Sequence, residues 1–92
     1  MTMLRADQGG RSNPAGLRGE YRPHVRVGDG ELLGVTLRHD DIAILAPGEP
    51  TQVSLHAVFP VNYGELQPGV AFDIVEGGTR VVGSGVVVDV QP

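Results

Sequence analysis

The chain has 92 residues, which is enough for one domain with a modest core and too few for a catalytic domain joined to a separate partner-binding domain. It contains no cysteine, which excludes disulfides, thiolate metal sites and thiol nucleophiles and agrees with a reducing compartment. The formal net charge is -4 and lysine is absent, so the chain lacks the basic stripe that general binding to nucleic acid requires.

The first twenty residues begin with a short apolar run and continue as a loop. Residues 1–4 are followed by Arg5 and Asp7, so we expect no secretory signal, and no later segment is long enough to span a bilayer; we expect a cytoplasmic protein. Turn-forming residues are dense from residue 5 to 20 and predict a long loop with neither helix nor central strand. Its arginines form either a solvated surface or a dock for an acidic partner or a phosphate. They are Arg5, Arg11 and Arg18.

From Tyr21 onward, apolar and polar residues alternate as in β-strands. In the first such segment, 21–27, Pro23 must lie at a strand start or edge because it has no N–H to donate. After a turn at 28–30, residues 32–37 form a second predicted strand. A polar break, His39-Asp40-Asp41, precedes a short apolar run at 42–45, which ends at Pro47-Gly48-Glu49-Pro50.

The segment 51–59 shows the clearest pattern of a half-buried strand. Its even-numbered residues, from Gln52 to His56, are polar and predict an exposed face. Its odd-numbered residues predict a face that packs in the core. They are Val53, Leu55, Ala57 and Phe59.

Two further strands follow, joined by a tight hairpin at Gly77-Gly78. In the first, Val70, Phe72 and Ile74 alternate with other residues. In the last, alternation predicts one inward face and, opposite to it, a face with Gly83 and Gly85. Glycine inside a strand indicates a close approach by other groups, so we expect the glycine face to be crowded. The predicted inward residues are Val82, Ser84, Val86, Val88 and Val90.

No segment shows the period of a helix, and about six strands with short links predict an all-β fold, a small barrel or sandwich. The chain reads as one domain. Residues 1–20 carry a short first strand and a loop rich in glycine and arginine, and residues 21–92 form the β-barrel core.

Four segments of the chain, at residues 9–14, 19–24, 47–49 and 72–87, resemble in order the third and C-terminal domain of translation elongation factor Tu. Gly9-Gly10-Arg11 followed by Pro14 resembles the family's Gly-Gly-Arg-His-Thr-Pro, and residues 19–24 resemble its Gly-Tyr-Arg-Pro-Gln with one residue inserted. Pro47-Gly48-Glu49 resembles its Pro-Gly-Asp. Residues 72–87 resemble its Phe-Ala-Ile-Arg-Glu-Gly-Gly-Arg-Thr-Val-Gly-Ala-Gly-Val-Val nearly throughout.

The resemblance implies a small six-stranded antiparallel β-barrel that, in the full factor, contacts the GTPase domain, the exchange factor and the T stem of aminoacyl-tRNA. The GTPase is missing here, because the chain has no Gly-x-x-x-x-Gly-Lys-Ser/Thr loop and no lysine to form one. The family's first strand is also shortened to Thr2–Leu4. A short first strand leaves a neighbouring edge unpaired, and proteins cover, blunt or pair such edges with a second chain.

The family's tRNA-contact positions carry over in part. Arg11, Glu76 and Gly77 match, and His24 stands where the family has glutamine. Together with Arg22 they form the candidate surface for a partner or RNA. Two further contact positions are changed to the apolar Leu33 and Phe59, which weakens the expectation of tRNA binding.

Our first hypothesis is a non-catalytic, stand-alone interaction module without cofactor or bound nucleotide, which binds an unknown protein or forms a homodimer through an exposed sheet edge. The alternative is an RNA-binding module in translation that recognises a T-stem-like surface. A third hypothesis, an enzyme or metal site built from His39, Asp40, Asp41 and His56, has little support, because adjacent residues of a turn rarely point at one ion.

No other polar group shows the spacing of a catalytic site. Ser84 lacks the Gly-x-Ser-x-Gly context of a nucleophile elbow, and Asp73 and Glu76 have opposite side-chain parity on one strand. We therefore expect no catalytic residue and no metal ligand.

Overall fold

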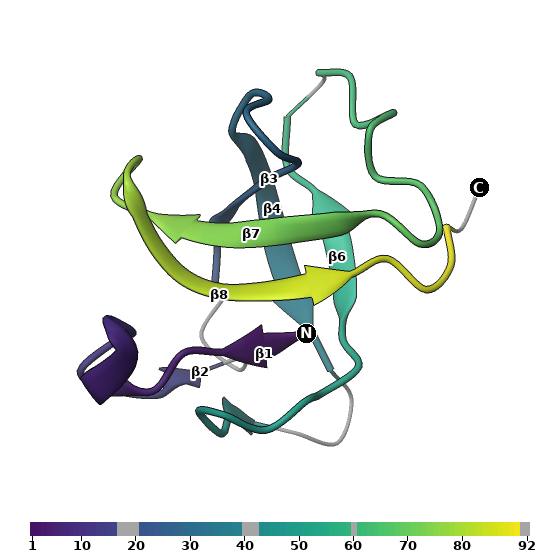
Figure 1. Ribbon diagram of the computed structural model, residues 1–92. Coiled ribbons are helices and arrows are strands. Elements are labelled where there is room, and N and C mark those ends of the chain that lie inside the picture. The colour runs from purple at the N-terminus through teal and green to yellow at the C-terminus, as the bar shows by residue number, and fades with distance from the viewer. Residues whose placement is uncertain (17–20, 40–42, 60, 91–92) are drawn as a thin grey trace.

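One antiparallel sheet of six strands forms the body of the protein, so the all-β prediction is confirmed. The structure is a computed structural model that describes residues 1–16, 21–39, 43–59 and 61–90. The sheet has the order β1-β8-β7-β3-β4-β6 and curls into a half-barrel, with β7 and β8 crossing in front of β4 and β6 (Figure 1). Its strands are β1 (Thr2–Met3), β3 (His24–Arg26), β4 (Leu33–Arg38), β6 (Ser54–Ala57), β7 (Ala71–Glu76) and β8 (Arg80–Val86).

The segment after β1 is more structured than its composition predicts. A 3-10 turn, η1 (Ala6–Gln8), follows β1, and β2 (Ala15–Gly16) pairs with β5 (Ile44–Leu45) in a separate two-stranded ribbon. The predicted loop thus contains one short 3-10 helix, which was not expected, and a two-residue strand that is not central but pairs with β5, because tertiary pairing overrides local preference. Arg18 lies outside the described residues.

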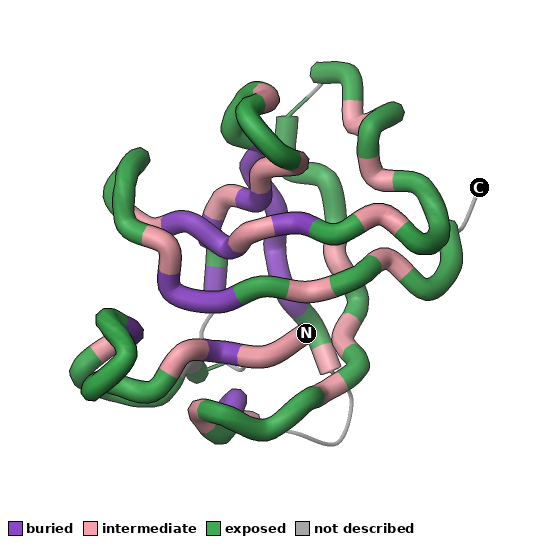
Figure 2. The backbone as a smooth tube through the Cα atoms, viewed as in Figure 1, coloured by how far each residue is buried: buried purple, intermediate pink, exposed green. Residues whose placement is uncertain are grey.

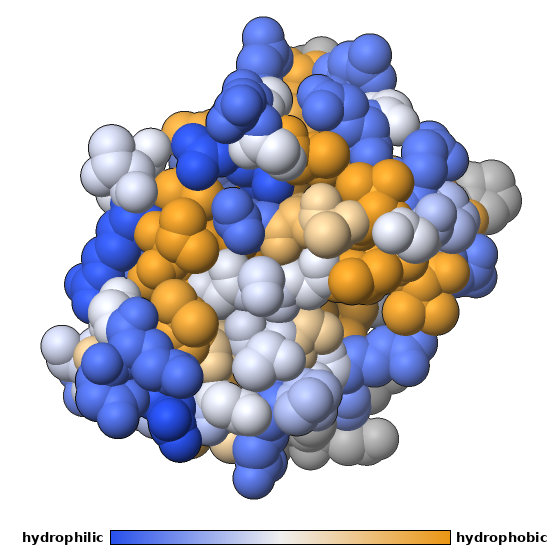
Figure 3. Space-filling model, viewed as in Figure 1, coloured by the Kyte–Doolittle hydropathy of each residue, from blue (hydrophilic) through white to orange (hydrophobic). Residues whose placement is uncertain are grey.

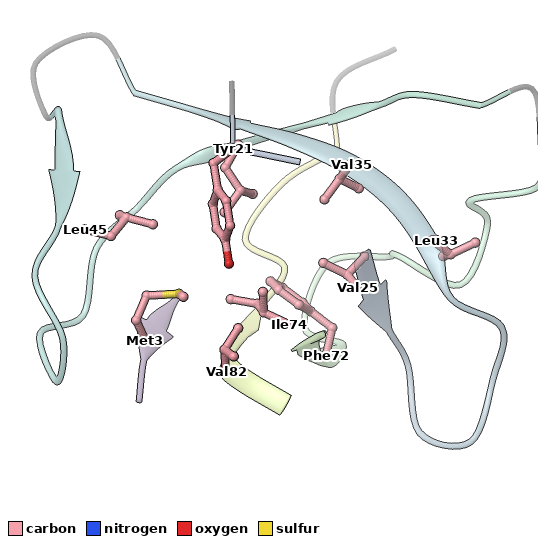
Figure 4. Close-up of a cluster of buried hydrophobic side chains, with 10 residues drawn as sticks. Met3, Tyr21, Val25, Leu33, Val35, Leu45, Phe72, Ile74 and Val82 are labelled. Atoms are coloured by element: carbon pink, nitrogen blue, oxygen red, sulfur yellow. The ribbon is translucent and has the colours of Figure 1, made fainter. Parts of the chain in front are cut away.

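Side chains from five of the six strands, together with Tyr21 and Leu45, meet in one apolar core. Burial is concentrated on β4 and on the central parts of β3, β7 and β8 (Figure 2). Tyr21 extends into this interior with its hydroxyl group leading (Figure 4). The core cluster consists of Met3, Tyr21, Val25, Leu33, Val35, Leu37, Leu45, Phe72, Ile74 and Val82.

The β3–β4 pair forms as alternation predicts. Pro23 lies immediately before β3, as expected for a residue that cannot donate to a ladder, and its carbonyl accepts a hydrogen bond from Val35 N–H at 3.1 Å. Tyr21 forms a bridge to Leu37 and extends the same pairing. The hairpin predicted between β7 and β8 is confirmed, since Gly77 and Gly78 have φ angles of 63° and 81°, which side chains disfavour.

A β-bulge in β8 changes which residues face the core. Ile74 lies opposite Gly83, whereas Val75 lies opposite Val81, so Val82 is an additional residue in β8. Val82 and Gly83 are both buried, and Ser84 beyond them is exposed. The prediction that Ser84, Val86, Val88 and Val90 share the inward face is therefore wrong: all four are exposed.

The glycine face of β8 is as crowded as predicted. A methyl group at Gly83 would lie 2.8 Å from the carbonyl oxygen of Thr2, and one at Gly85 would lie 2.6 Å from Cζ of Phe72. These glycines let β1 and the Phe72 ring approach β8 closely.

The strand β6 lies at the free end of the sheet, and its predicted inward face is only partly buried. Val53 and Leu55 are half-buried and pack against the core. Ala57 and Phe59 are exposed, contrary to the prediction, because Ala57 lies on the unpaired edge of the sheet and Phe59 lies beyond the end of β6. Over the described residues, no helix is long and apolar enough to cross a membrane.

Candidate interaction surface

The curled sheet is joined at one end, where β1 meets the segment that leads into β6. The Met1 ammonium group donates a hydrogen bond to the Thr51 carbonyl at 2.7 Å, and Thr51 N–H donates to the Met1 carbonyl at 2.8 Å. Gly48 N–H donates to the Met3 carbonyl at 2.8 Å. This pairing ends at Met1, so the two sides of the half-barrel have no shared ladder beyond it in the part of the chain that the structure describes.

Beyond Met1 the two sides enclose a groove of about 920 Å³, which we call the seam. Residues 50–57 form one wall of the seam and residues 86–90 the other, with Met1 at the joined end. Its floor consists of two core side chains, Val35 and Phe72, and two half-buried side chains that pack against the core, Tyr63 and Leu66. The seam therefore lies where a further strand would close the barrel, and its lining is largely apolar.

The outer edge of β6 has no strand partner among the described residues. Val58 N–H donates to the Gly34 carbonyl at 3.3 Å, so the residues of β6 with the same parity, Ser54 and His56, direct their backbone groups to β4. The alternate residues Val53, Leu55 and Ala57 direct theirs into the seam. This edge carries no charged residue and no proline, the devices that usually block edge pairing.

The opposite wall of the seam ends in exposed valines. The exposed fractions of Val86, Val88 and Val90 are 55%, 69% and 47%. Hydrophobic surface gathers on the right of Figure 3, where Figure 1 shows the chain leaving β8. An apolar surface beside an unpaired edge is a typical feature of a protein-binding site.

Two of the predicted surface residues, Arg11 and Glu76, contact each other. Nη1 of Arg11 lies 2.6 Å from Oε2 of Glu76, and the Tyr21 hydroxyl donates a hydrogen bond to the same oxygen. The Arg11 guanidinium also lies over the Tyr21 ring, 5.1 Å from its centroid, and its Nε donates to the Asn13 carbonyl at 3.0 Å. Arg11 therefore fastens the N-terminal segment to the end of β7, and its charge is compensated within the chain.

Burial raises the pKa of the Tyr21 hydroxyl well above its ordinary value, and the hydrogen bond to Glu76 adds to this shift, while Arg11 acts in the opposite direction. Nearby, the Arg80 guanidinium donates hydrogen bonds to the carbonyl groups of Gly9 and Gly10. The candidate RNA-contact residue Arg11 and the nearby Arg80 thus both bind other parts of the same chain.

Of the other candidate surface residues, Gly77 follows Glu76 in the hairpin, and His24 pairs with Val75, the residue before Glu76. Arg22 is exposed just before β3, and His24 is half-buried in β3, opposite Val75 and Gly34. The structure thus brings Arg11 and Glu76 into contact and places His24 on the neighbouring strand, while Arg22 follows Tyr21 in the chain.

Phe59 covers the outer face of β4 rather than entering the core. A methyl group at Gly34 would lie 2.6 Å from the Phe59 ring, so the glycine allows the ring to lie on the strand. The Tyr63 hydroxyl donates to the Gly34 carbonyl at 2.5 Å and accepts from the N–H groups of Val58 and Phe59, both at 3.3 Å. Tyr63 therefore holds the segment after β6 against the sheet.

The residues of the candidate metal site lie only partly within the described structure. Asp40 and Asp41 lie outside the described residues, His39 follows β4, and His56 is exposed in β6. Within the described ranges, no three histidine or acidic residues lie close enough together to hold a metal ion.

The chain matches no known protein-family model. The seam itself was not among the predicted site residues. The alternation of residues 51–59 indicated a half-buried strand, but no local pattern shows which strand lacks a neighbour, because that depends on where distant strands end.

Proposed function

We propose that this protein is a non-catalytic β-barrel interaction module that binds a protein partner at the seam. The observation that carries the proposal is the unpaired edge of β6 beside an apolar groove, at the place where a closed barrel would have a further strand. Unpaired N–H and C=O groups at a sheet edge bind extended segments of other chains.

The resemblance to the third domain of elongation factor Tu supports a role in binding. In the full factor that domain serves as a platform for other macromolecules. The alternative function, RNA binding, has weaker support, because the Arg11 and Arg80 side chains are bound within the chain and the net charge is negative.

The proposal is tested by site-specific photocrosslinking in native cell extract. A photoreactive amino acid at Ala57, on the edge of the seam, should give defined protein adducts. The matched control carries it at Thr79, which is also exposed but lies in the β7–β8 hairpin, outside the lining of the seam. Equal adducts from both positions, or none from Ala57, would contradict the proposal.

The RNA alternative is tested by titrating the protein with tRNA at low and at moderate salt. Contacts between arginine and the phosphate backbone of RNA weaken steeply as the salt concentration rises. Specific recognition of tRNA should therefore survive moderate salt, and Arg22→Gln should reduce the affinity for tRNA. We expect no binding at moderate salt.

A further inference from the structure

We propose that the occupant of the seam is one extended strand of the partner protein, which continues the line of β1 beyond Met1 and runs antiparallel to both β6 and β8. This inference rests on the proposed function and adds to it the direction, the register and the side-chain pattern of the bound segment.

The direction follows from the pairing already present at the joined end. β1 runs antiparallel to β8, with Thr2 opposite Ser84, and antiparallel to the segment before β6, with Met1 opposite Thr51. A segment that continues β1 upstream lies between the two walls of the seam with the same polarity. The opposite polarity would break the line of hydrogen bonds at Met1.

The register follows from the alternation of backbone bonds along β1. The backbone groups of Met1 and Met3 bond to residues 48–51, whereas Leu4 N–H donates to the Val82 carbonyl of β8 at 2.8 Å. Upstream of Met1, the same alternation directs every second residue to Val53, Leu55 and Ala57 in turn. The residues between them face β8.

On the β8 wall of the seam, too, alternate residues direct their backbone groups into the seam, in the register that continues from β1. Val87 N–H donates to the Val70 carbonyl at 2.9 Å and the Val87 carbonyl accepts from Gly69 N–H at 2.7 Å, so Val87 bonds on the side of β7. Its neighbour Val86 therefore directs its backbone groups to the opposite side, into the seam. One strand of about six residues can satisfy both walls, since strands advance about 3.3 Å per residue.

The side-chain pattern follows from β1 as well. Met3 is buried and Met1 packs against the core, whereas Thr2 alternates with them on the other face. In the occupant, the residues that bond to β6 therefore point inward, over Val35 and Phe72, and must be apolar. The residues that bond to β8 point outward and can be polar.

Charge supports the same pattern. The groups lining the seam that carry charge near neutral pH are the Met1 ammonium and the Asp89 carboxylate, with the titratable imidazole of His56, and the floor side chains are uncharged. An inward-facing charge on the occupant would lose its hydration without a partner. The occupant is thus an extended segment with apolar, uncharged residues at alternate positions.

The register can be tested in the full chain by closing the seam in cis. One variant carries Val-Thr-Val-Thr-Val-Thr directly before Met1, which places valine at the inward positions. The control carries Thr-Val-Thr-Val-Thr-Val, which has the same composition and the opposite phase. We expect the first to raise the Tm by about 5 °C or more relative to the control, as added stability of about 1 kcal/mol does in a domain of this size.

Amide hydrogen exchange provides a second comparison of the two extended variants. The N–H groups of Val53, Leu55 and Ala57 should exchange at least about tenfold more slowly in the in-phase variant, because they then donate to the added strand. Equal Tm values and equal exchange in the two variants would overturn the proposed register, whether or not the protein binds a partner.

The extensions also separate this inference from the proposed function. Partner adducts from position 57 should fall by about tenfold or more with the in-phase extension and persist with the control. Adducts that persist with both extensions would overturn the strand inference and leave the binding module intact. Sedimentation measures whether the protein forms a homodimer. A homodimer that dissociates with the in-phase extension and persists with the control would show that the occupant is a second copy of this chain, and would overturn the assignment to a partner protein.

Discussion

The Tyr21 hydroxyl donates a hydrogen bond to the Glu76 carboxylate, joining the segment that leads into β3 to the end of β7. Arg11 binds the same carboxylate, so one acidic group holds the N-terminal segment and the core tyrosine together. Both side chains of the ion pair are less than one third exposed. This arrangement is a structural clamp at the base of the half-barrel.

Glu76→Gln should destabilise the fold, because it removes the charge that Arg11 and Tyr21 share. Loss of charge-assisted hydrogen bonds in a partly buried setting costs about 1–3 kcal/mol. Urea denaturation measures the change. Glu31→Gln, at an exposed position, is the control and should change the free energy of unfolding by less than about 0.5 kcal/mol. Equal effects of the two substitutions would contradict the clamp.

The raised pKa of Tyr21 predicts a loss of stability in alkali. The folded protein holds the phenolic proton to a higher pH than the unfolded chain does, so this contribution is intact below about pH 10, the ordinary tyrosine value. It declines as the pH rises above that value, because the unfolded chain then ionises first. Thermal unfolding from pH 8 to 11 should show the decline in the native protein and a flatter curve in Tyr21→Phe. An unchanged slope in Tyr21→Phe would assign the alkaline decline to other groups.

The strands and the main hairpin were predictable from sequence, whereas the faces of β8 were not. Alternation located β3, β4, β6 and β7 within a few residues, because period two is a local property of the chain. The bulge at Val82 reversed the remainder of β8, and nothing in a run of valines and glycines marks where an additional residue enters.

The candidate site was predictable to a smaller extent. The resemblance selected Arg11 and Glu76, which do lie together, but as partners of each other in an ion pair. The edge at Leu55 and Ala57 was not selected, because these residues were predicted to be buried. An edge arises from the order of strands in the sheet, which period and composition do not encode.

Gly83→Ala should lower stability, because the added methyl group would lie 2.8 Å from the backbone oxygen of Thr2 and 3.0 Å from the side chains of Ile74 and Met3. The pairing of β1 with β8 must then shift, at a cost of about 1–3 kcal/mol. Gly16→Ala is the control, since a methyl group there meets no atom within 4 Å. Thermal unfolding should separate the two variants, and similar Tm values would contradict the close approach.

Tyr63→Phe should loosen the segment after β6 without unfolding the sheet. It removes the hydrogen bond to the Gly34 carbonyl and the acceptor for two N–H groups, at a cost of about 1–2 kcal/mol. Amide exchange should accelerate at Val58 and Phe59. The exchange rate of the Ile74 amide in the core should change only as much as the free energy of global unfolding requires. Uniform acceleration at all three would show that Tyr63 supports the whole domain.

Two neighbouring proline substitutions should have opposite outcomes, because adjacent residues of β6 face different partners. His56 has the parity that directs its N–H to β4, so His56→Pro removes a ladder bond and should cost about 3 kcal/mol or more. Ala57 directs its N–H into the seam and is exposed, so Ala57→Pro should cost about 1 kcal/mol or less. Urea denaturation compares the two.

The same pair bears on binding, since Ala57→Pro removes one of the donors that face an incoming strand. It should weaken partner capture by about tenfold while the fold persists, and Ala57→Val, which keeps the N–H and adds β propensity, should not. If Ala57→Pro unfolds the domain as severely as His56→Pro, the edge of β6 faces a partner within the chain, and the seam has no free strand edge to offer.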